Sequence, residues 1–168
     1  MAESAVELVT SFLEAMNLWD FPGMRARLHP EKFTFRMPYH PEWMPGELAG
    51  RDAYLAFAEE WSNAIDGTEN LQEVDVHAFA DEPGTVIARF RNSFELLESG
   101  FKYANDLVGV FTVEGKWITL FEERLNPIPL VLATGGEVLS PQEARSVRES
   151  VRRSTSRFGV GPVARGGG

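Results

Sequence analysis

Residues 102–127 read KYANDLVGVFTVEGKWITLFEERLNP, and this stretch decides the fold. Strand-like apolar runs lie on both sides of Glu114-Gly115, a turn dipeptide, so the stretch predicts two antiparallel strands joined by a tight turn. The second strand ends in FEERLNP at residues 121–127, where two adjacent carboxylates precede an arginine. Such a charged strand end is either hydrated or functional, and the answer depends on which way each carboxylate faces.

Side chains alternate between the two faces of a strand. One predicted face contains Trp117, Thr119, Phe121, Glu123 and Leu125, and the other contains Ile118, Leu120, Glu122 and Arg124. If the first face lies toward the core, Glu123 is a carboxyl group held among aromatic side chains. There the loss of hydration would raise its pKa and suit it to proton transfer near neutral pH. The alternative is a hydrated strand end. On the opposite face, Glu122 is expected to pair with Arg124 or to lie in a dimer contact.

Upstream of this hairpin, three helices and an isolated strand are predicted. Ser4 and Glu7 form a capping box, and apolar residues at helical spacing predict a helix over 4–18. Asp20, followed by Pro22 just inside the helix, predicts a second short helix through Leu28. Other expected elements are a short strand at 32–37, a long irregular loop at 37–50 and a third helix from about Arg51 to Ile65.

From residue 71 onward the apolar pattern alternates with a period of two. Strands are therefore predicted at 71–80, 85–97, 101–113 and 116–125. Helices followed by a run of meandering strands indicate an α+β fold. The sheet is expected to end at Asn126-Pro127, with Gly135-Gly136 as a linker. A second capping box at Ser140–Glu143 then predicts a helix to about Ser156. We thus expect a domain at 1–135, followed by a basic C-terminal helix and a Gly-rich, partly disordered tail at 136–168.

Charge is distributed unevenly over the 168 residues. The net charge is −9, but residues 134–168 hold six arginines against three glutamates, which leaves −12 for residues 1–133. An acidic body repels phosphate backbones, so we expect no nucleic-acid binding. No apolar run approaches the roughly 20 residues of a membrane span. The N-terminus lacks the features of a signal peptide, and the absence of cysteine excludes disulfides and thiolate metal sites. A cytoplasmic location is expected.

The order of predicted elements resembles the nuclear transport factor 2-like fold, also called the ketosteroid isomerase-like or SnoaL-like fold. In that fold a strongly curved mixed sheet wraps around three helices and forms a cone with a deep apolar pocket. The resemblance covers residues 4–135. It rests on Tyr-x-Asn at 103–105, the Gly-Lys turn, the acidic residue before Asn-Pro, and GRDAY at 50–54. The segment EERLNPIPLVLATGG at 122–136 looks most like the phenazine biosynthesis A/B branch.

The resemblance implies a role for Glu123. In the phenazine branch the glutamate on the strand before Asn-Pro acts on the ligand, and Glu123 matches that position. A histidine on the third helix assists there, whereas residues 53–64 of this chain contain no histidine. Either His40 or His77 takes that part, or no histidine is used. His77 shares a predicted face with Asp75 and Glu73, which is typical of an exposed position.

Asn105 and Tyr103 share a predicted strand face that, by the resemblance, looks into the cone. Asn105 is either a hydrogen-bonding group for a substrate oxygen or a polar group that satisfies the sheet edge. Tyr103 is expected to help orient the substrate.

Five further residues complete the candidate site. His40 lies between prolines in the aromatic loop, near the expected cone opening, and is either a second acid/base group or an exposed loop residue. Tyr39, Trp43, Trp61 and Phe121 are the candidates for the substrate-binding wall. No His-x-His or His-x3-His pair is present, so we expect no metal.

These features predict a cofactor-independent isomerase, cyclase or dehydratase for a small hydrophobic molecule, plausible in secondary metabolism. Glu123 would supply the acid/base chemistry. The alternative is a non-catalytic ligand-binding or dimerisation module on the same fold. A homodimer is expected through the outer face of the sheet, where an apolar patch would otherwise be exposed. The patch comprises Ile118, Leu120, Val108 and Val110.

Overall fold

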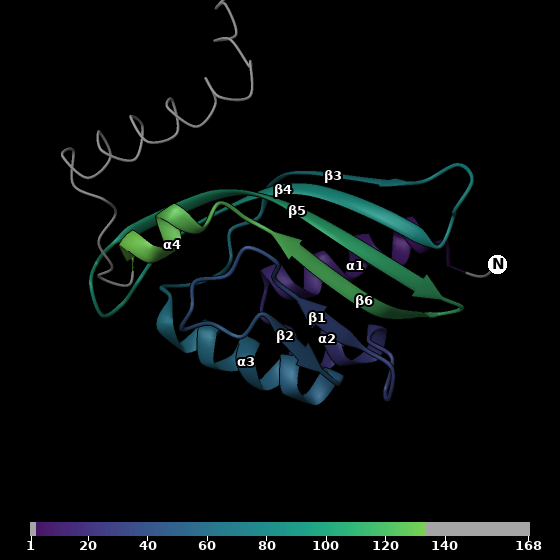
Figure 1. Cartoon of the computed structure of the whole chain (residues 1–168), viewed down its shortest axis with the longest axis horizontal. Helices are drawn as coiled ribbons and strands as arrows, with labels where there is room; N and C mark the ends of the chain where they lie inside the picture. Colours follow the sequence, from purple (N-terminus) through teal and green to yellow (C-terminus); the bar gives the residue numbers. More distant parts are fainter. Residues whose placement is uncertain (1–2, 134–168) are drawn as a thin grey trace, which may run out of the picture. The chain divides into compact units, whose positions relative to one another are not determined.

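The first two helices begin at the residues that the sequence predicts. In the computed structural model, which describes residues 3–133, α1 spans Ala5–Asn17 (Figure 1). Ser4 Oγ accepts a hydrogen bond from the Glu7 amide at 3.2 Å, and the Glu7 carboxylate accepts one from the Ser4 amide at 2.8 Å. α2 spans Phe21–Arg27, and the side chain of Asp20 caps it. The predicted capping box and the predicted Asp20 cap are both confirmed.

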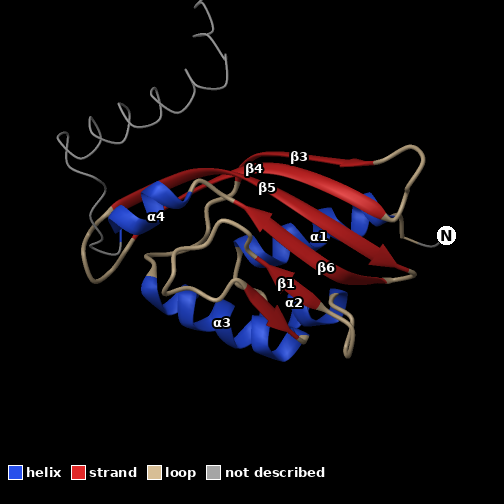
Figure 2. Ribbon diagram, in the orientation of Figure 1, coloured by secondary structure: helices blue, strands red, loops and turns tan. Residues whose placement is uncertain are grey.

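The sheet is mixed, curved and open, which confirms the predicted α+β fold. Its strands are β1 (Thr34–Arg36), β2 (Glu47–Ala49), β3 (Gln72–Ala78), β4 (Thr85–Glu95), β5 (Lys102–Glu114) and β6 (Trp117–Arg124). Their order across the sheet is β2-β1-β6-β5-β4-β3. β1 runs parallel to β6, and every other neighbouring pair is antiparallel. Figure 2 shows the long strands β4, β5 and β6 side by side.

Helices cover one side of this sheet. α1 packs against β3, β4 and β6, while α3 (Arg51–Ala64) packs against β1 and β2. The core between them is aromatic, and Phe12, Phe35, Phe111 and Phe121 are fully buried. The rings of Phe111 and Phe121 stack with centroids 4.5 Å apart and an interplanar angle of 7°. The predicted hairpin therefore forms the floor of the core.

Two elements appear where none was predicted. β2 lies inside the stretch that the sequence marks as an irregular loop, and it pairs with β1. α4 (Pro127–Ala133) follows β6 directly and packs against β5. Pro127 and Pro129 suggested only the end of the sheet. Both fall in the first helical turn, where backbone N–H groups have no intrahelical acceptor, so proline removes no hydrogen bond there.

The alternation predicted Ile118 on the outer face of β6, and this prediction is wrong. The register shifts between Thr112, which pairs with Leu120, and Val113, which pairs with Ile118. Thr119 is therefore an extra residue on β6, and such a bulge reverses the alternation on one side of it. As a result Ile118 is fully buried in the core. Beyond the bulge, Phe121 lies on the predicted inner face.

Residues Met1–Gly136 form a compact unit. The predicted helix over Ser140–Ser156 and the predicted Gly-rich tail lie outside the described residues. Among residues 3–133, no helix is both long enough and apolar enough to cross a membrane.

Candidate active site

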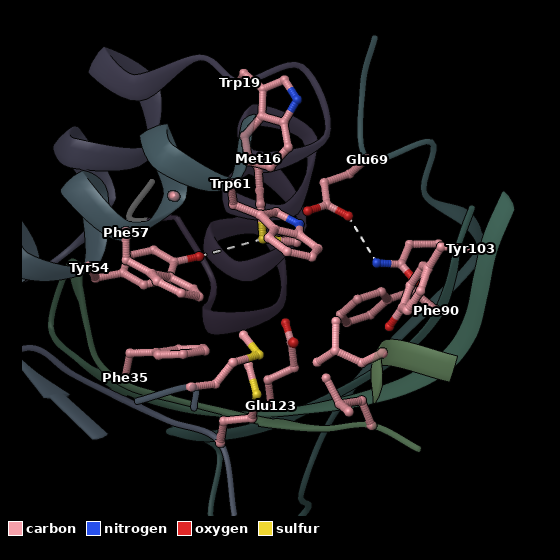
Figure 3. Close-up of a pocket in the computed structure, with 16 residues that line it drawn as sticks. Met16, Trp19, Phe35, Tyr54, Phe57, Trp61, Glu69, Phe90, Tyr103 and Glu123 are labelled. Atoms are coloured by element: carbon pink, nitrogen blue, oxygen red, sulfur yellow. Dashed lines mark hydrogen bonds between the residues drawn. The ribbon is translucent and has the colours of Figure 1, made fainter. Parts of the chain in front are cut away.

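One cavity lies between the helices and the inner face of the sheet (Figure 3). The space free of protein atoms among its walls is about 590 Å³, part of it open to solvent. The cavity therefore suits a small organic molecule. Its lining residues are Met16, Trp19, Phe35, Met37, Met44, Tyr54, Phe57, Ala58, Trp61, Glu69, Phe90, Asn92, Tyr103, Glu123, Leu125 and Leu130.

Glu123 projects from β6 into this cavity (Figure 3). It pairs in register with Gly109 on β5, next to the stacked pair of Phe111 and Phe121. A Cβ atom on Gly109 would lie only 2.7 Å from the ring of Phe111. A residue without a side chain at 109 therefore leaves room for the aromatic stack beside Glu123.

Burial, and to a smaller extent the negative charge of Glu69, raise the pKa of Glu123 to about 8. The charged form is disfavoured because it loses hydration and because it faces a second carboxylate. At neutral pH most Glu123 side chains are therefore protonated. A minority carry the carboxylate, because the pKa lies only about one unit above neutral pH.

Glu69 is the second carboxyl group of the cavity, and it was not among the predicted site residues. It lies between α3 and β3, and only 6% of its surface is exposed. Asn92 Nδ2 donates a hydrogen bond to Glu69 Oε2 at 2.9 Å. Burial raises the pKa of Glu69 to about 7, while hydrogen bonds from Asn92 and Trp61 lower it in part. Figure 3 shows Glu69 and Glu123 entering the cavity from different elements.

The mostly polar run DGTENLQE at residues 66–73 is typical of a surface turn, so its pattern does not indicate that Glu69 is buried. The sequence feature that could have indicated a polar group in the cavity lies on β4. Val86, Ala88, Phe90 and Phe94 alternate as buried residues, and Asn92 occupies the same buried phase. A buried amide needs hydrogen-bond partners, so Asn92 points to a polar group on the inner side of the sheet.

Tyr103, predicted to orient the substrate, and Trp61, a predicted wall residue, both line the cavity. The Tyr103 ring stacks on Phe94 with centroids 4.6 Å apart. Asn105 does not line the cavity. Its Nδ2 donates to Tyr103 Oη and to the Asn126 carbonyl, both at 2.8 Å, and its Oδ1 accepts from the Asn126 amide at 3.3 Å. Asn105 thus holds the end of β6 against β5, which is the structural alternative that the sequence left open.

The other predicted wall residues lie outside the cavity. Phe121 is fully buried in the core and does not line it. Tyr39 and Trp43 are 56% and 55% exposed. Their loop is closed by a hydrogen bond from the Met37 amide to the Gly46 carbonyl, and it turns Met37 and Met44 inward instead. The apolar side chains of the loop, and not its aromatic ones, reach the cavity.

Neither candidate histidine lines the cavity. The Nδ1 atom of His40 lies 2.9 Å from the Pro41 carbonyl oxygen, and its ring packs so closely on Gly46 that a Cβ atom there would collide with it. His77 is exposed, and its Nε2 lies 2.6 Å from the Asp75 carboxylate. The two histidines are thus engaged with their own loop and strand.

Two buried polar atoms at the cavity, Trp19 Nε1 and Asn92 Oδ1, have no hydrogen-bond partner within residues 3–133. Trp19 adopts a left-handed backbone with φ of 55°, directly after the C-terminal end of α1. Glycine is usual at such a position, and a left-handed backbone costs other residues about 1–2 kcal/mol. Strain of this kind is common in ligand-binding sites. The pair offers a ligand one donor and one acceptor.

Glu122 lies on the opposite face of β6 and pairs with Arg124, with 2.7 Å between Glu122 Oε1 and Arg124 Nε. The pairing with Arg124 is one of the two alternatives predicted for Glu122, the other being a dimer contact. Within residues 3–133, no group of three or more histidine, aspartate or glutamate side chains is arranged to hold a metal ion.

A curved mixed sheet that encloses an apolar cavity with helices defines the NTF2-like class of proteins. The model of the SnoaL-like domain matches residues 9–121. The chain therefore belongs to the SnoaL-like family.

The chain is also similar to individual proteins. It is 26% identical over 142 residues to YesE, an uncharacterised protein of Bacillus subtilis (strain 168), covering 84% of this chain and 95% of YesE. A solved structure of a candidate isomerase from Bacillus subtilis superposes with a TM-score of 0.70 at 24% identity, covering 81% of this chain and 96% of the other.

Two further structures have a TM-score of 0.65. They are a candidate polyketide cyclase from Xanthomonas campestris pv. campestris and a phenazine biosynthesis-related protein from Pseudomonas aeruginosa. The identities are 23% and 14%, with 77% and 80% of this chain covered and 95% and 82% of the other chains. At these identities the structures share the fold with this chain.

Proposed function

We propose that this protein is an enzyme that moves a proton within a small, largely apolar molecule, as in isomerisation, dehydration or cyclisation. Glu123 is the acid/base group, and the reaction needs no cofactor. One observation carries the proposal: the Glu123 carboxyl projects into an aromatic cavity where burial and Glu69 raise its pKa to about 8. A pKa close to the working pH is what proton transfer in both directions requires.

The chemistry follows from the cavity's own groups. The carboxylate form of Glu123 takes a proton from a carbon next to an electron-withdrawing group, such as a carbonyl or a protonated imine. The electron pair moves toward that group, where the N–H of Trp19 or the protonated form of Glu69 donates a hydrogen bond. Glu123 then returns the proton at a different carbon. The similar structures of a candidate isomerase and a candidate cyclase support this reaction class.

The test uses 3-cyclohexenone, a single-ring ketone small enough for the cavity. Its conversion to 2-cyclohexenone removes a proton from C2, shifts the double bond into conjugation and adds a proton at C4, which raises the ultraviolet absorbance. We expect the wild-type protein to accelerate this conversion, with a rate that rises with pH through about 8 as the carboxylate forms. Glu123→Gln should lower the acceleration about 10²–10⁴-fold, the usual value of a general acid/base.

Glu122→Gln is the matched control, because it makes the same chemical change one residue away on the other face of β6. Its rate should stay within about twofold of the wild type, as expected for a surface side chain. Equal rates in the two variants would contradict the role of Glu123. A wild-type protein that binds the ketone without moving a proton would favour the alternative, a ligand-binding module.

A further inference from the structure

The ionisable groups of the cavity are all acids. Tyr54, Glu69, Tyr103 and Glu123 line it, and no lysine, arginine or histidine does so among the described residues. Each of these four groups is either neutral or negative at any pH. A ligand that carries a negative charge would therefore meet repulsion and no counter-ion.

The two carboxyl groups of the cavity differ from other carboxylates of the protein. On the surface, Glu122 pairs with Arg124, Asp75 with Arg89 and Glu47 with Arg36. Within residues 3–133, no such ion pair includes Glu69 or Glu123. Ionising a buried carboxyl group is unfavourable without a cation beside it. The cavity thus contains two carboxyl groups whose ionised forms a cation beside them would stabilise.

The remaining walls suit a cation as well. Aromatic rings attract cations to their faces, tryptophan most strongly. Seven aromatic residues line the cavity, which are Trp19, Phe35, Tyr54, Phe57, Trp61, Phe90 and Tyr103. Asn92 is 93% buried, and its Oδ1 atom accepts no hydrogen bond from any residue in the described part of the chain. An ammonium or iminium N–H on the ligand would supply one.

From this arrangement we infer that the cavity selects ligands with a positively charged nitrogen on a small apolar or aromatic body, and that Glu69 and Glu123 are their joint counter-ions. This inference names the ligand class of the proposed site and so rests on the proposed function. It also assigns Glu69 and Asn92 to ligand recognition.

Three soluble one-ring probes separate charge from shape: benzylammonium, benzyl alcohol and benzoate. Their affinities for the full-length protein are measured by calorimetry at about pH 6 and about pH 8.5, which bracket the pKa values of Glu69 and Glu123. Burial holds the pKa values of Tyr54 and Tyr103 above their ordinary value, so both stay protonated across this range.

We expect benzylammonium to bind at least about tenfold more tightly than benzyl alcohol at the higher pH, and benzoate to bind most weakly. The affinity for benzylammonium should rise at least about tenfold from the lower to the higher pH, because the cation competes with protons for the two carboxylates. Heats measured in buffers of different ionisation enthalpy should show proton release on binding. The affinity for benzyl alcohol should change little.

Variants assign the selectivity to residues. Glu69→Gln and Glu123→Gln should each reduce the preference for benzylammonium over benzyl alcohol about tenfold, and the double variant should abolish it. Glutamine at 69 keeps a hydrogen bond with Asn92 possible, and a thermal unfolding curve checks that each variant is folded. Glu122→Gln should leave the preference unchanged.

A wild-type protein that binds benzyl alcohol as tightly as benzylammonium, that prefers benzoate, or that binds none of the probes overturns the inference. If 3-cyclohexenone isomerisation still depends on Glu123 in that case, the proposed function stands and only the ligand class fails. Charge selection that disappears in the double variant, combined with isomerisation that is indifferent to Glu123, would sustain the binding site and contradict the proposed catalysis.

Discussion

Glu122 and Glu123 are adjacent in the chain and lie in opposite surroundings. The carboxylate of Glu122 faces outward and pairs with the guanidinium of Arg124. The carboxyl of Glu123 faces an aromatic cavity, and the charge that acts on its pKa there is that of another glutamate, Glu69. The same side chain is thus an ion-pair partner on the outer face at one position and a cavity-lining acid with a pKa of about 8 at the next. The alternation of a β-strand is enough to produce that difference.

The contrast extends to the apolar residues of the same strand. Phe121 is fully buried and stacks on Phe111, whereas Leu120 on the outer face remains partly exposed. The inner face carries the packing that supports the cavity, and the outer face is free to meet solvent or a second copy of the chain. Each of the following tests compares these two faces.

The largest effect is expected for the core. Phe121→Ala should lower the free energy of unfolding by about 3–5 kcal/mol, because it removes a fully buried ring and leaves a cavity. Leu120→Ala, the matched change on the outer face, should cost less than about 1.5 kcal/mol. Urea denaturation monitored by tryptophan fluorescence measures both values. Similar losses in the two variants would mean that the outer face is buried in solution.

The next effect concerns stability and pH. The unfolded chain loses the Glu123 proton near the ordinary value of 4.5, and the folded protein keeps it to about 8. Between these values the folded state binds more protons, so its stability falls as the pH rises. Glu123→Gln should remove this contribution and make the protein more stable than the wild type above pH 8, by roughly 1–3 kcal/mol.

Glu122→Gln is again the control for this experiment. It should leave the pH dependence unchanged and cost at most about 1 kcal/mol, because it removes an ion pair whose arginine is exposed to solvent and whose glutamine replacement can still accept a hydrogen bond. Unfolding curves recorded between pH 5 and about 9 give both comparisons. Parallel pH profiles for the wild type and Glu123→Gln would show that Glu123 ionises freely and is not buried in solution.

Sequence analysis located most of the fold and half of the polar site. Capping residues and alternation predicted the helices and the long strands, and the phase of β6 beyond the bulge placed Glu123 on the inner face. Ile118 was misplaced because a single inserted residue reverses the alternation, and no residue type in the strand marks that insertion. Glu69 was missed for a different reason. Its loop is polar throughout, and only tertiary packing against Asn92 buries it.

A smaller effect is expected at the outer face, where we predict a homodimer. With Ile118 in the core, the apolar patch that remains consists of Val108, Val110 and Leu120, all partly exposed. Sedimentation equilibrium at tens of micromolar, roughly the range of typical subunit affinities, should show a dimer. Leu120→Lys should shift it toward monomer while the cavity still binds benzylammonium. A wild-type monomer at this concentration would contradict the prediction.

The smallest effect is expected when residues 138–168 are deleted. Residues Met1–Gly136 form a compact unit, and the whole of β6 belongs to it. The removed segment has few apolar residues and a Gly-rich end, so its loss should change the free energy of unfolding by less than about 1 kcal/mol. Unfolding should stay cooperative, and Glu123→Gln should have the same effect in the truncated protein as in the full chain. A truncated protein that unfolds without cooperativity would show that the segment belongs to the core. One that folds but loses the pH-dependent affinity for benzylammonium would show that the removed segment contributes to ligand binding.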